Sequence, residues 1–551
     1  MRPGFDEKSS VLNKERRRDL LVLGTQGTLI PDSRRFGLVL DGVDLNAGAA
    51  ESLLEPWMCA AAREIDLRVP AELRTCGGEP IDLAALFEGL GERLRGMLTQ
   101  VLAAYPDTTP ERLAREFPLL SSLLKNAVAE WVDATAIFLA RLHADAARLA
   151  GWLGYEKLPG LLSLTPTGSD SHAGGHKVLR LSFRDGPCMY YKPRSVTGEG
   201  LWDGLMKAVH AHSSLQLTSA STLNGSPASY GWVRSLAPHT QVLRWDGNSV
   251  EARAYWHAAG ATLCLAEHVR MTDLHMANVM ATACGPALFD AESLGSPRFA
   301  VVDALANQGA GAALARVMGD LEDTLLLPNR DREGLADTSG FFGRSAAVPE
   351  ILIPRWSPCA DGRQRLEMMP AALAEHGNAP PGATAVEVLP LLVSGYREAA
   401  AALMRCRDSL IAPHSAWRRT LEHSHAPRMV LRDTFAYGIL LSRSLEPEQL
   451  RSPEARRLAV QRALRGGTRR PFPDAVLRTE MRTLLQLHVP RFTALPGSRT
   501  LGSSSGRALA PRLLECTPAE SVLRKLQELS PERVDEIHVP ALCLAVLGGR
   551  G

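Results

Sequence analysis

The amino-acid sequence predicts an α+β fold in which two β-hairpins lie between long α-helical regions. Apolar residues recur at three- and four-residue steps over 83–102 and 119–149, which is the periodicity of amphipathic helices. Residues 178–192 alternate as strands do on either side of an Asp-Gly turn, which predicts the first hairpin. Two short apolar runs, 279–281 and 287–289, flank a Gly-Pro breaker and predict the second hairpin.

Length and composition are those of a large globular protein. The chain has 551 residues, of which 45% are hydrophobic and 22% charged, enough for roughly two to four domains with buried cores. The formal net charge is +2, so bulk charge favours neither nucleic acid nor a membrane surface as a partner. No apolar run approaches the roughly 18 residues of a membrane-spanning helix. Nine scattered cysteines without a C-x-x-C pair indicate reduced thiols, and we expect a cytoplasmic protein.

We expect three regions along the chain. Residues 1–160 should be mainly helical, and residues 161–305 should form a core with both hairpins. Residues 306–551 should again be mainly helical. Within this last region, the Pro-rich stretch 354–358 predicts a loop, and the Gly- and Ser-rich stretch 497–506 predicts a flexible loop between helices.

The stretch with the most chemical information is 272–278. Asp273 and Asn278 are five residues apart, as in the catalytic loop of protein kinases, where the Asp accepts the substrate hydroxyl proton and the Asn holds magnesium. Twelve residues further on, Asp290 stands where a kinase has its second metal-binding Asp. The spacing therefore indicates phosphoryl transfer. From these residues alone, a solvated loop followed by an ordinary hairpin explains the same pattern.

The region before this stretch contains two further kinase-like features. A Gly-rich loop over 165–175 precedes the first hairpin, and the second strand of that hairpin ends at Lys192. In kinases such a loop covers the nucleotide phosphates and a strand lysine contacts them. These glycines do not fit G-x-G-x-x-G, and Lys192 alone could be a surface lysine on an edge strand. The joint order of loop, lysine, Asp-x-x-x-x-Asn and Asp is harder to obtain by chance than any single part.

Two polar residues interrupt an otherwise apolar segment near the start of the last quarter of the chain. An arginine fork at Arg428 and a hydroxyl at Thr434 could hold a phosphate group. A salt-bridged arginine and a helix-capping threonine explain the same residues, and the sequence leaves both interpretations open.

Four segments together resemble the dehydratase domain of class II (LanM-type) lanthipeptide synthetases. These segments are Ser169-Asp170-Ser171-His172-x-x-Gly175, Tyr191-Lys192-Pro193-Arg194-Ser195, Thr272-Asp273-Leu274-His275-x-x-Asn278 and Asp290-x-Glu292-Ser293-Leu294. The clear match runs from about 165 to 445. The resemblance implies a bilobal core similar to lipid kinases, with extensive additional α-helical regions.

The resemblance also implies the activity of a peptide Ser/Thr dehydratase. Such enzymes phosphorylate Ser and Thr of a leader-bearing precursor peptide with ATP and Mg²⁺, and then eliminate the phosphate to leave dehydroalanine or dehydrobutyrine. The residues implied for phosphorylation are Lys192, Asp273, His275, Asn278, Asp290 and Glu292. Those that match positions assigned to elimination are Asp170, His172, Arg428 and Thr434.

Within these sets the resemblance places Lys192 and Glu292 on ATP, and Asn278 and Asp290 on Mg²⁺. The chemistry of the side chains agrees with the elimination step. An Asp and His pair can move protons near neutral pH, and Arg428 with Lys192 can stabilise the charge that develops on the departing phosphate. The sequence does not identify the base that removes the proton.

The chain departs from the family pattern in two places. Ala277 stands where the family commonly has an acidic residue, and the chain ends at Gly551 without the zinc-binding cyclase domain that follows in LanM enzymes. We therefore expect a stand-alone dehydratase or an excised domain, with ring closure by a separate cyclase.

Three functions are compatible with these residues. The first is the two-step dehydratase, with a precursor peptide as partner and with neither nucleic acid nor a membrane. The second is a kinase that stops at phosphorylation, on a peptide or a small molecule. The third is a non-catalytic scaffold that binds a leader peptide.

Overall fold

A computed structural model describes most of the chain. The described residues are 47–168, 174–184, 186–236, 249–300, 310–328, 337–342, 350–358, 364–372, 378–380, 382–432, 434–466 and 472–547. They form a mixture of α-helices and small antiparallel sheets, so the predicted α+β class is confirmed. No described helix combines the length and apolar character needed to cross a membrane.

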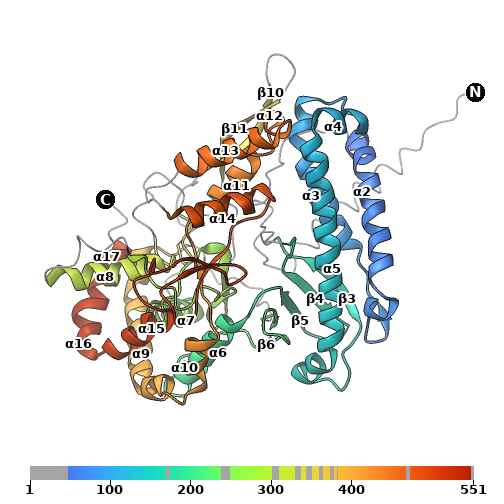
Figure 1. Cartoon of the computed structure of the whole chain (residues 1–551). Helices are drawn as coiled ribbons and strands as arrows, with labels where there is room; N and C mark the ends of the chain where they lie inside the picture. Colours follow the sequence, from blue (N-terminus) through green and yellow to red (C-terminus); the bar gives the residue numbers. More distant parts are fainter. Residues whose placement is uncertain are drawn as a thin grey trace, which may run out of the picture.

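The described part begins with a group of long helices. Helices α2 (Ala47–Arg68), α3 (Ala84–Ala104) and α5 (Pro118–Leu153) stand side by side, and the short α4 (Pro110–Glu116) connects the last two (Figure 1). Helix α5 starts with proline at its first position and ends at Gly154, whose φ of 85° is the left-handed conformation of a helix C-cap. The two helices predicted here are confirmed.

A five-stranded antiparallel sheet packs against these helices. Its strand order is β3-β4-β5-β7-β6. The strands are β3 (Leu161–Pro166), β4 (Leu179–Phe183), β5 (Cys188–Lys192), β6 (Thr222–Asn224) and β7 (Gly231–Arg234). The predicted first hairpin is β4 with β5. Because β5 pairs on both sides, with β4 and with β7, the edge-strand interpretation of Lys192 is wrong.

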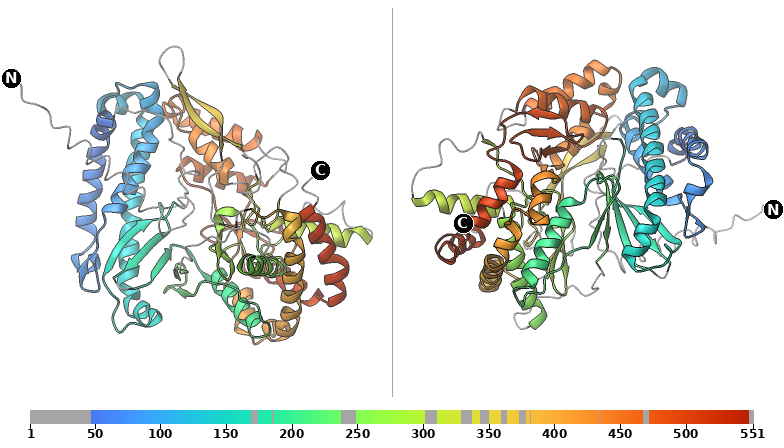
Figure 2. Two further views of the ribbon diagram at one scale, coloured as in Figure 1. Left: turned by 180° about the vertical axis from the view of Figure 1, so that it is seen from behind. Right: turned by 60° about the horizontal axis from the view of Figure 1, so that its bottom comes forward.

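The second half of the molecule has its own hydrophobic core, separate from the core between the sheet and the first helices. Figure 2 shows the helices of this half beside the five-stranded sheet and the first helices. The main helices of this half are α6 (Thr197–His210), α7 (Val250–His268), α8 (Ala310–Asp323), α9 (Ala385–Ile411), α10 (Ala416–His423), α15 (Pro518–Glu528) and α17 (Val539–Leu547). Helices α7 and α9 cross closely at two glycines. A Cβ on Gly260 would lie 2.0 Å from the Leu392 carbonyl oxygen, and one on Gly395 would lie 1.8 Å from that of His257.

The second predicted hairpin is also confirmed. A short 3-10 turn (Met276–Asn278) leads into β8 (Val279–Thr282), which pairs with β9 (Gly285–Leu288). The backbone N–H of Phe289 donates to the Asn278 carbonyl at 3.0 Å. The hairpin thus brings the chain back beside Asn278, so that residues 278 and 290 lie near the same end of the hairpin.

The loop predicted for 354–358 is wrong. Strands β10 (Glu350–Pro358) and β11 (Gln364–Ala372) form a two-stranded antiparallel ladder in which Pro354 is opposite Met368. Proline is tolerated here because each strand of a two-stranded ladder has an outer edge, where the missing N–H breaks no ladder hydrogen bond.

The flexible loop predicted for 497–506 is also wrong in part. Four short strands form an antiparallel sheet in the order β12 (Arg428–Met429), β13 (Phe492–Ala494), β14 (Leu501–Ser503) and β15 (Ala508–Ala510). Strands of two or three residues are too short to produce a readable alternation.

The other elements of the C-terminal region that the structure describes are helices. They are α11 (Thr434–Arg443), α12 (Pro447–Leu450), α13 (Pro453–Gly466), α14 (Asp474–Leu485) and α16 (Pro531–Arg533). Near the N-terminal helices, β1 (Thr75–Cys76) and β2 (Glu79–Pro80) form one further small ladder.

Candidate active site

The stretch 272–278 follows α7 in a constrained backbone conformation. Arg270 and Asp273 have positive φ angles of 52° and 63°. Such angles are uncommon outside glycine and concentrate at functional sites. The Ser293 hydroxyl fixes the loop: it accepts from the Thr272 N–H at 3.2 Å and donates to the Thr272 carbonyl at 2.5 Å. The loop is thereby tied to the segment that contains Asp290.

Asn278 is oriented by a hydrogen bond to the same loop. Its Nδ2 donates to the Asp273 carbonyl at 2.8 Å, so the amide oxygen points away from that contact. Because the backbone of Phe289 pairs with that of Asn278, Asp290, which is the next residue, lies close to Asn278. Asp273, Asn278 and Asp290 therefore lie close together at one end of the hairpin.

Lys192 reaches the same place from the sheet. Its Nζ donates to Glu199 Oε1 and to the Phe289 carbonyl, both at 2.7 Å, and lies 3.9 Å from Asp290 Oδ1. The Lys192 side chain is only 8% exposed, so it is a buried, paired lysine. Glu199, in the first turn of α6, was not singled out in the sequence. Its position seven residues after the strand lysine, at the start of the next helix, is the signal that would have identified it.

Arg194 is the second residue that the sequence reasoning left without a role. Its guanidinium contacts three carboxylates: Nη2 lies 2.7 Å from Glu199 and 2.5 Å from Asp290, and Nε lies 3.0 Å from Glu292. Burial by itself would raise the pKa of Glu199. The charges of Arg194 and Lys192 outweigh burial and hold that pKa at about 2 instead of 4.5.

Arg428 connects the loop with the segment after the hairpin. Its Nη1 lies 2.8 Å from Glu292 Oε1 and 3.3 Å from Asp273 Oδ2. Arg491, just before β13, donates to Glu292 Oε2 through Nη2 at 3.0 Å and Nε at 3.3 Å. Arg428 is therefore salt-bridged, which was one of its two interpretations. Burial raises the pKa of Asp273; Arg428 and His275 oppose this, and Glu292 and Asp290 add to it.

We call these side chains the charged cluster. It contains four cations and four carboxylates, and so carries no formal net charge. Its members are Lys192, Arg194, Arg428, Arg491, Glu199, Asp273, Asp290 and Glu292. A neutral cluster of this kind favours an anion that brings its own counter-cation, such as a magnesium–nucleotide complex, over a free polyanion.

Two side chains of the cluster region have the chemistry of a magnesium site. The contacts of these side chains use Nδ2 of Asn278 and Oδ1 of Asp290. They do not use Oδ1 of Asn278 or Oδ2 of Asp290. An amide oxygen and a carboxylate oxygen are hard ligands of the kind Mg²⁺ prefers. The residues present therefore fit a magnesium ion.

The remaining predicted residues have different outcomes. His275 caps the 3-10 turn: its Nδ1 accepts from the Ala277 N–H at 3.3 Å, and its Nε2 lies 3.3 Å from Asn278 Nδ2. Thr434 is the first residue of α11. Its hydroxyl is not among the described groups that form the charged cluster. Asp170 and His172 lie outside the described residues.

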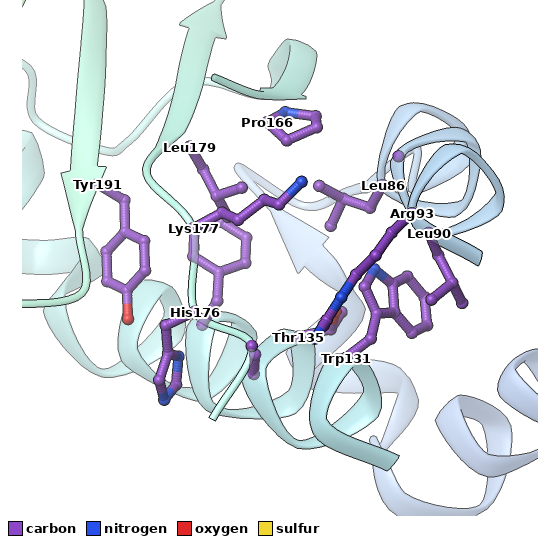
Figure 3. Close-up of a pocket in the computed structure, with 14 residues that line it drawn as sticks. Leu86, Leu90, Arg93, Trp131, Thr135, Pro166, His176, Lys177, Leu179 and Tyr191 are labelled. Atoms are coloured by element: carbon purple, nitrogen blue, oxygen red, sulfur yellow. The ribbon is translucent and has the colours of Figure 1, made fainter. Parts of the chain in front are cut away.

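A small hollow of about 50 Å³ lies between the sheet and helices α3 and α5 (Figure 3). Tyr191 lines this hollow. The side chain of Lys192, which follows Tyr191 on β5, points to the opposite face of the sheet, because successive residues of a strand point to opposite faces. Arg93 and Trp131 line the helical side of the hollow, and Lys177 lines it from the segment between the Gly-rich loop and β4. The hollow is therefore separate from the charged cluster.

Comparison with known proteins adds two findings. The model of a family described as "Domain of unknown function (DUF4135)" matches residues 117–495. The chain is also 19% identical over 445 residues to the "Lacticin 481/lactococcin biosynthesis protein LcnDR2" of Lactococcus lactis subsp. lactis. This match covers 77% of the chain and 46% of the relative, so the chain spans about half the length of that protein.

Proposed function

This chain belongs to the DUF4135 family, and we propose that it is a peptide Ser/Thr dehydratase of lanthipeptide biosynthesis. It would phosphorylate Ser and Thr of a precursor peptide with ATP and Mg²⁺ and then eliminate the phosphate. The similarity to a lacticin biosynthesis protein supports a role in modifying such a peptide. The observation that carries the proposal is the 3.3 Å contact between Arg428 and Asp273, since it joins an expected elimination residue to the expected phosphorylation base.

A lipid-kinase-like bilobal core is part of the proposal. Two separate hydrophobic cores support it, one under the five-stranded sheet and one around α7 and α9. The pair between Lys192 and Glu199 supports it further, since protein kinases need a strand lysine paired with a helix glutamate. The charged cluster would then be the place where ATP meets the peptide.

In the first step, the peptide hydroxyl oxygen attacks the γ-phosphorus of ATP. A new O–P bond forms, the bond to the β-phosphate oxygen breaks, and ADP leaves with the electron pair. Asp273 accepts the hydroxyl proton, and its raised pKa suits a general base better than that of an exposed carboxylate. Magnesium bound with ATP would offset phosphate charge, and Asn278 and Asp290 would hold it.

In the second step, a base removes the Cα proton of the phosphorylated residue. The Cβ–O bond breaks, its electron pair leaves on the phosphate, and the Cα–Cβ bond becomes a double bond. Arg428 and Lys192 would stabilise the negative charge on the departing phosphate. Both are buried, and charges act more strongly where water is excluded.

Mass spectrometry of a candidate precursor peptide tests the whole reaction. A short Ser-, Thr- and Cys-rich peptide encoded beside this gene would be incubated with the full chain, ATP and Mg²⁺. We expect products lighter by one water for each modified residue. An Asp273→Asn variant should leave the peptide unmodified, because the carboxylate that accepts the proton is gone.

A second experiment separates the dehydratase from a kinase that stops at phosphorylation. The same peptide is synthesised with phosphoserine at one position and incubated with ADP and Mg²⁺ but without ATP. A dehydratase releases phosphate and forms dehydroalanine, whereas a kinase leaves the phosphopeptide intact. If the unphosphorylated peptide of the first experiment gains phosphate from ATP and never loses water, the kinase alternative holds. Binding without any change of mass would favour the leader-binding scaffold.

A further inference from the structure

A second cavity, of about 200 Å³, lies between α7, α8 and α15, outside the charged cluster. Six basic side chains line it. They are Arg270, Arg298, Arg316, Arg524, Lys525 and Arg533. The volume is well above the roughly 10–15 Å³ that a single water needs by the same measure. A small ion with several oxygens therefore fits inside.

The wall of this cavity has an excess of positive charge. Three carboxylates, Asp320, Glu515 and Glu528, also line it, so the lining groups carry three more positive charges than negative. Glu267 and Asp323, which pair with Lys525 and Arg270, reduce the excess to one. A site with this balance attracts an anion.

One lining group shows which kind of anion fits. His268 is 1% exposed, and its Nδ1 lies 2.8 Å from the Cys264 carbonyl oxygen. A carbonyl oxygen only accepts, so Nδ1 carries the proton. Burial lowers the pKa of His268 to about 4, and the ring is neutral at pH 7. Nε2 is then an acceptor, and it is buried without a hydrogen-bond partner among the described residues.

A metal ion is a poor occupant of this place. Glu267, His268 and His538 lie close enough together to suggest one. However, the Lys525 ammonium is 2.8 Å from Glu267 Oε1. Glu267 Oε2 accepts a hydrogen bond from the Tyr396 hydroxyl and lies 3.2 Å from His538 Nδ1. Both carboxylate oxygens are occupied, and the neighbouring cations repel a metal.

We propose that this cavity binds a phosphate ion that retains a hydroxyl, with inorganic hydrogen phosphate as the simplest case. Its unprotonated oxygens accept from the arginines and Lys525, and its P–OH donates to His268 Nε2. Sulfate has the same shape and no hydroxyl at neutral pH. A phosphate monoester loses its second proton near pH 6, so above that pH it has none either. The histidine therefore favours inorganic phosphate over both.

The cavity is linked to the candidate active site through Arg270. Arg270 Nε donates to the Ser296 carbonyl at 3.3 Å, and the Arg270 carbonyl accepts from the Ser296 N–H at 3.1 Å. Arg270 thereby joins the segment before Asp273 to the segment after Asp290. A phosphate on Arg270 would hold these two segments together. The binding site itself does not depend on the function proposed above.

Isothermal titration calorimetry on the full chain tests the site. Sodium phosphate, sodium sulfate and O-phosphoserine are titrated separately at pH 8 and equal ionic strength. We expect phosphate to bind at least about tenfold more tightly than either control, because an unpaired buried acceptor costs about that much. Equal affinity for phosphate and sulfate would overturn the proposal. Tighter binding of O-phosphoserine would overturn the choice of the inorganic ion.

Two variants locate the binding. Arg524→Gln should weaken phosphate and sulfate alike by about tenfold. Its control is Arg457→Gln on α13, which removes a charge of similar exposure (40% against 46%) and should change nothing. His268→Leu keeps a side chain of comparable size and has no acceptor in place of Nε2, so only the preference for phosphate over sulfate should fall.

The titration remains decisive if His268→Leu does not fold, since the wild-type preference and Arg524→Gln suffice. Phosphate binding that persists in Arg524→Gln and disappears in Arg428→Gln would place the ion in the charged cluster. That result would overturn the proposal.

Discussion

The ammonium of Lys192 lies 2.7 Å from Glu199 Oε1, and both side chains are more than nine-tenths buried. Arg194 contacts the same oxygen, also at 2.7 Å. Glu199 thus connects the end of strand β5 to the first turn of α6, and two cations share its single charge. The charged cluster is held together from this side of the molecule by one carboxylate that the sequence motifs do not include.

We expect Glu199→Gln to destabilise the fold and to abolish activity. The substitution keeps the shape and leaves Lys192 and Arg194 without their shared counter-charge. Removing one partner of a buried ion pair costs about 3–5 kcal/mol. Urea unfolding followed by circular dichroism measures the loss, and the peptide assay measures activity.

Glu454→Gln is the matched control for this experiment. Glu454 pairs with Arg457 on α13, and its side chain is 61% exposed. Exposed pairs contribute little to stability because water screens them, so this variant should keep both its stability and its activity. Equal stability of the two variants would show that the contacts of Glu199 contribute little.

The same carboxylate predicts how stability depends on pH. The pKa of Glu199 is about 2 in the folded protein and 4.5 ordinarily, so its contribution is fully present above pH 4.5 and disappears as the pH falls towards 2. The whole contribution is roughly 3 kcal/mol. The difference in unfolding free energy between the wild type and Glu199→Gln should shrink by about 1.4 kcal/mol by pH 3.5. A difference that stays constant from pH 7 to pH 3.5 would contradict the lowered pKa.

The parts of the site that the sequence predicts are those with fixed local spacing. Asp273, Asn278 and Asp290 lie on one loop and one tight hairpin, so their separation along the chain determines their separation in space. Lys192 was placed by the strand alternation that ends at it. The same local logic predicted both hairpins and the long helices.

The parts that the sequence does not predict depend on contacts between distant segments. Arg491 reaches Glu292 across 199 residues, and a single arginine in a chain with many carries no signal. Arg194 was visible in the motif, but its three carboxylate contacts arise only after folding. The strands β13 to β15 have three residues each and pair because β12 and the neighbouring helices position them.

Arg491→Gln should lower activity and leave the protein folded. Arg428 holds Oε1 of Glu292, and Arg491 holds Oε2 together with Arg194, so losing Arg491 leaves the carboxylate attached but less firmly oriented. A hydrogen bond to a charged group contributes about 1.5–3 kcal/mol, which corresponds to roughly a tenfold or greater loss of kcat/KM. Steady-state kinetics with varied ATP measures it.

Arg507→Gln is the control for Arg491, because Arg507 is exposed in the β14–β15 connection of the same small sheet. It should keep wild-type kinetics. If Arg491→Gln also behaves as the wild type, Arg428 and Arg194 suffice to hold Glu292, and Arg491 has no positioning role.

Two glycines in the first turn of α6 provide a test of how closely this helix must approach the segment after β9. A Cβ on Gly198 would lie 2.3 Å from the Ala291 carbonyl oxygen and 3.1 Å from the His425 ring, whereas one on Gly200 would meet only the Thr222 hydroxyl at 3.5 Å. Gly198→Ala must therefore push α6 away, and Glu199 moves with it. Overpacking costs about 1–3 kcal/mol, while Gly200→Ala should gain roughly 0.5–1 kcal/mol from its helical position. Urea unfolding should separate the two variants in opposite directions, with loss of peptide modification in Gly198→Ala alone; similar stability and activity in both would mean that the close approach is not required.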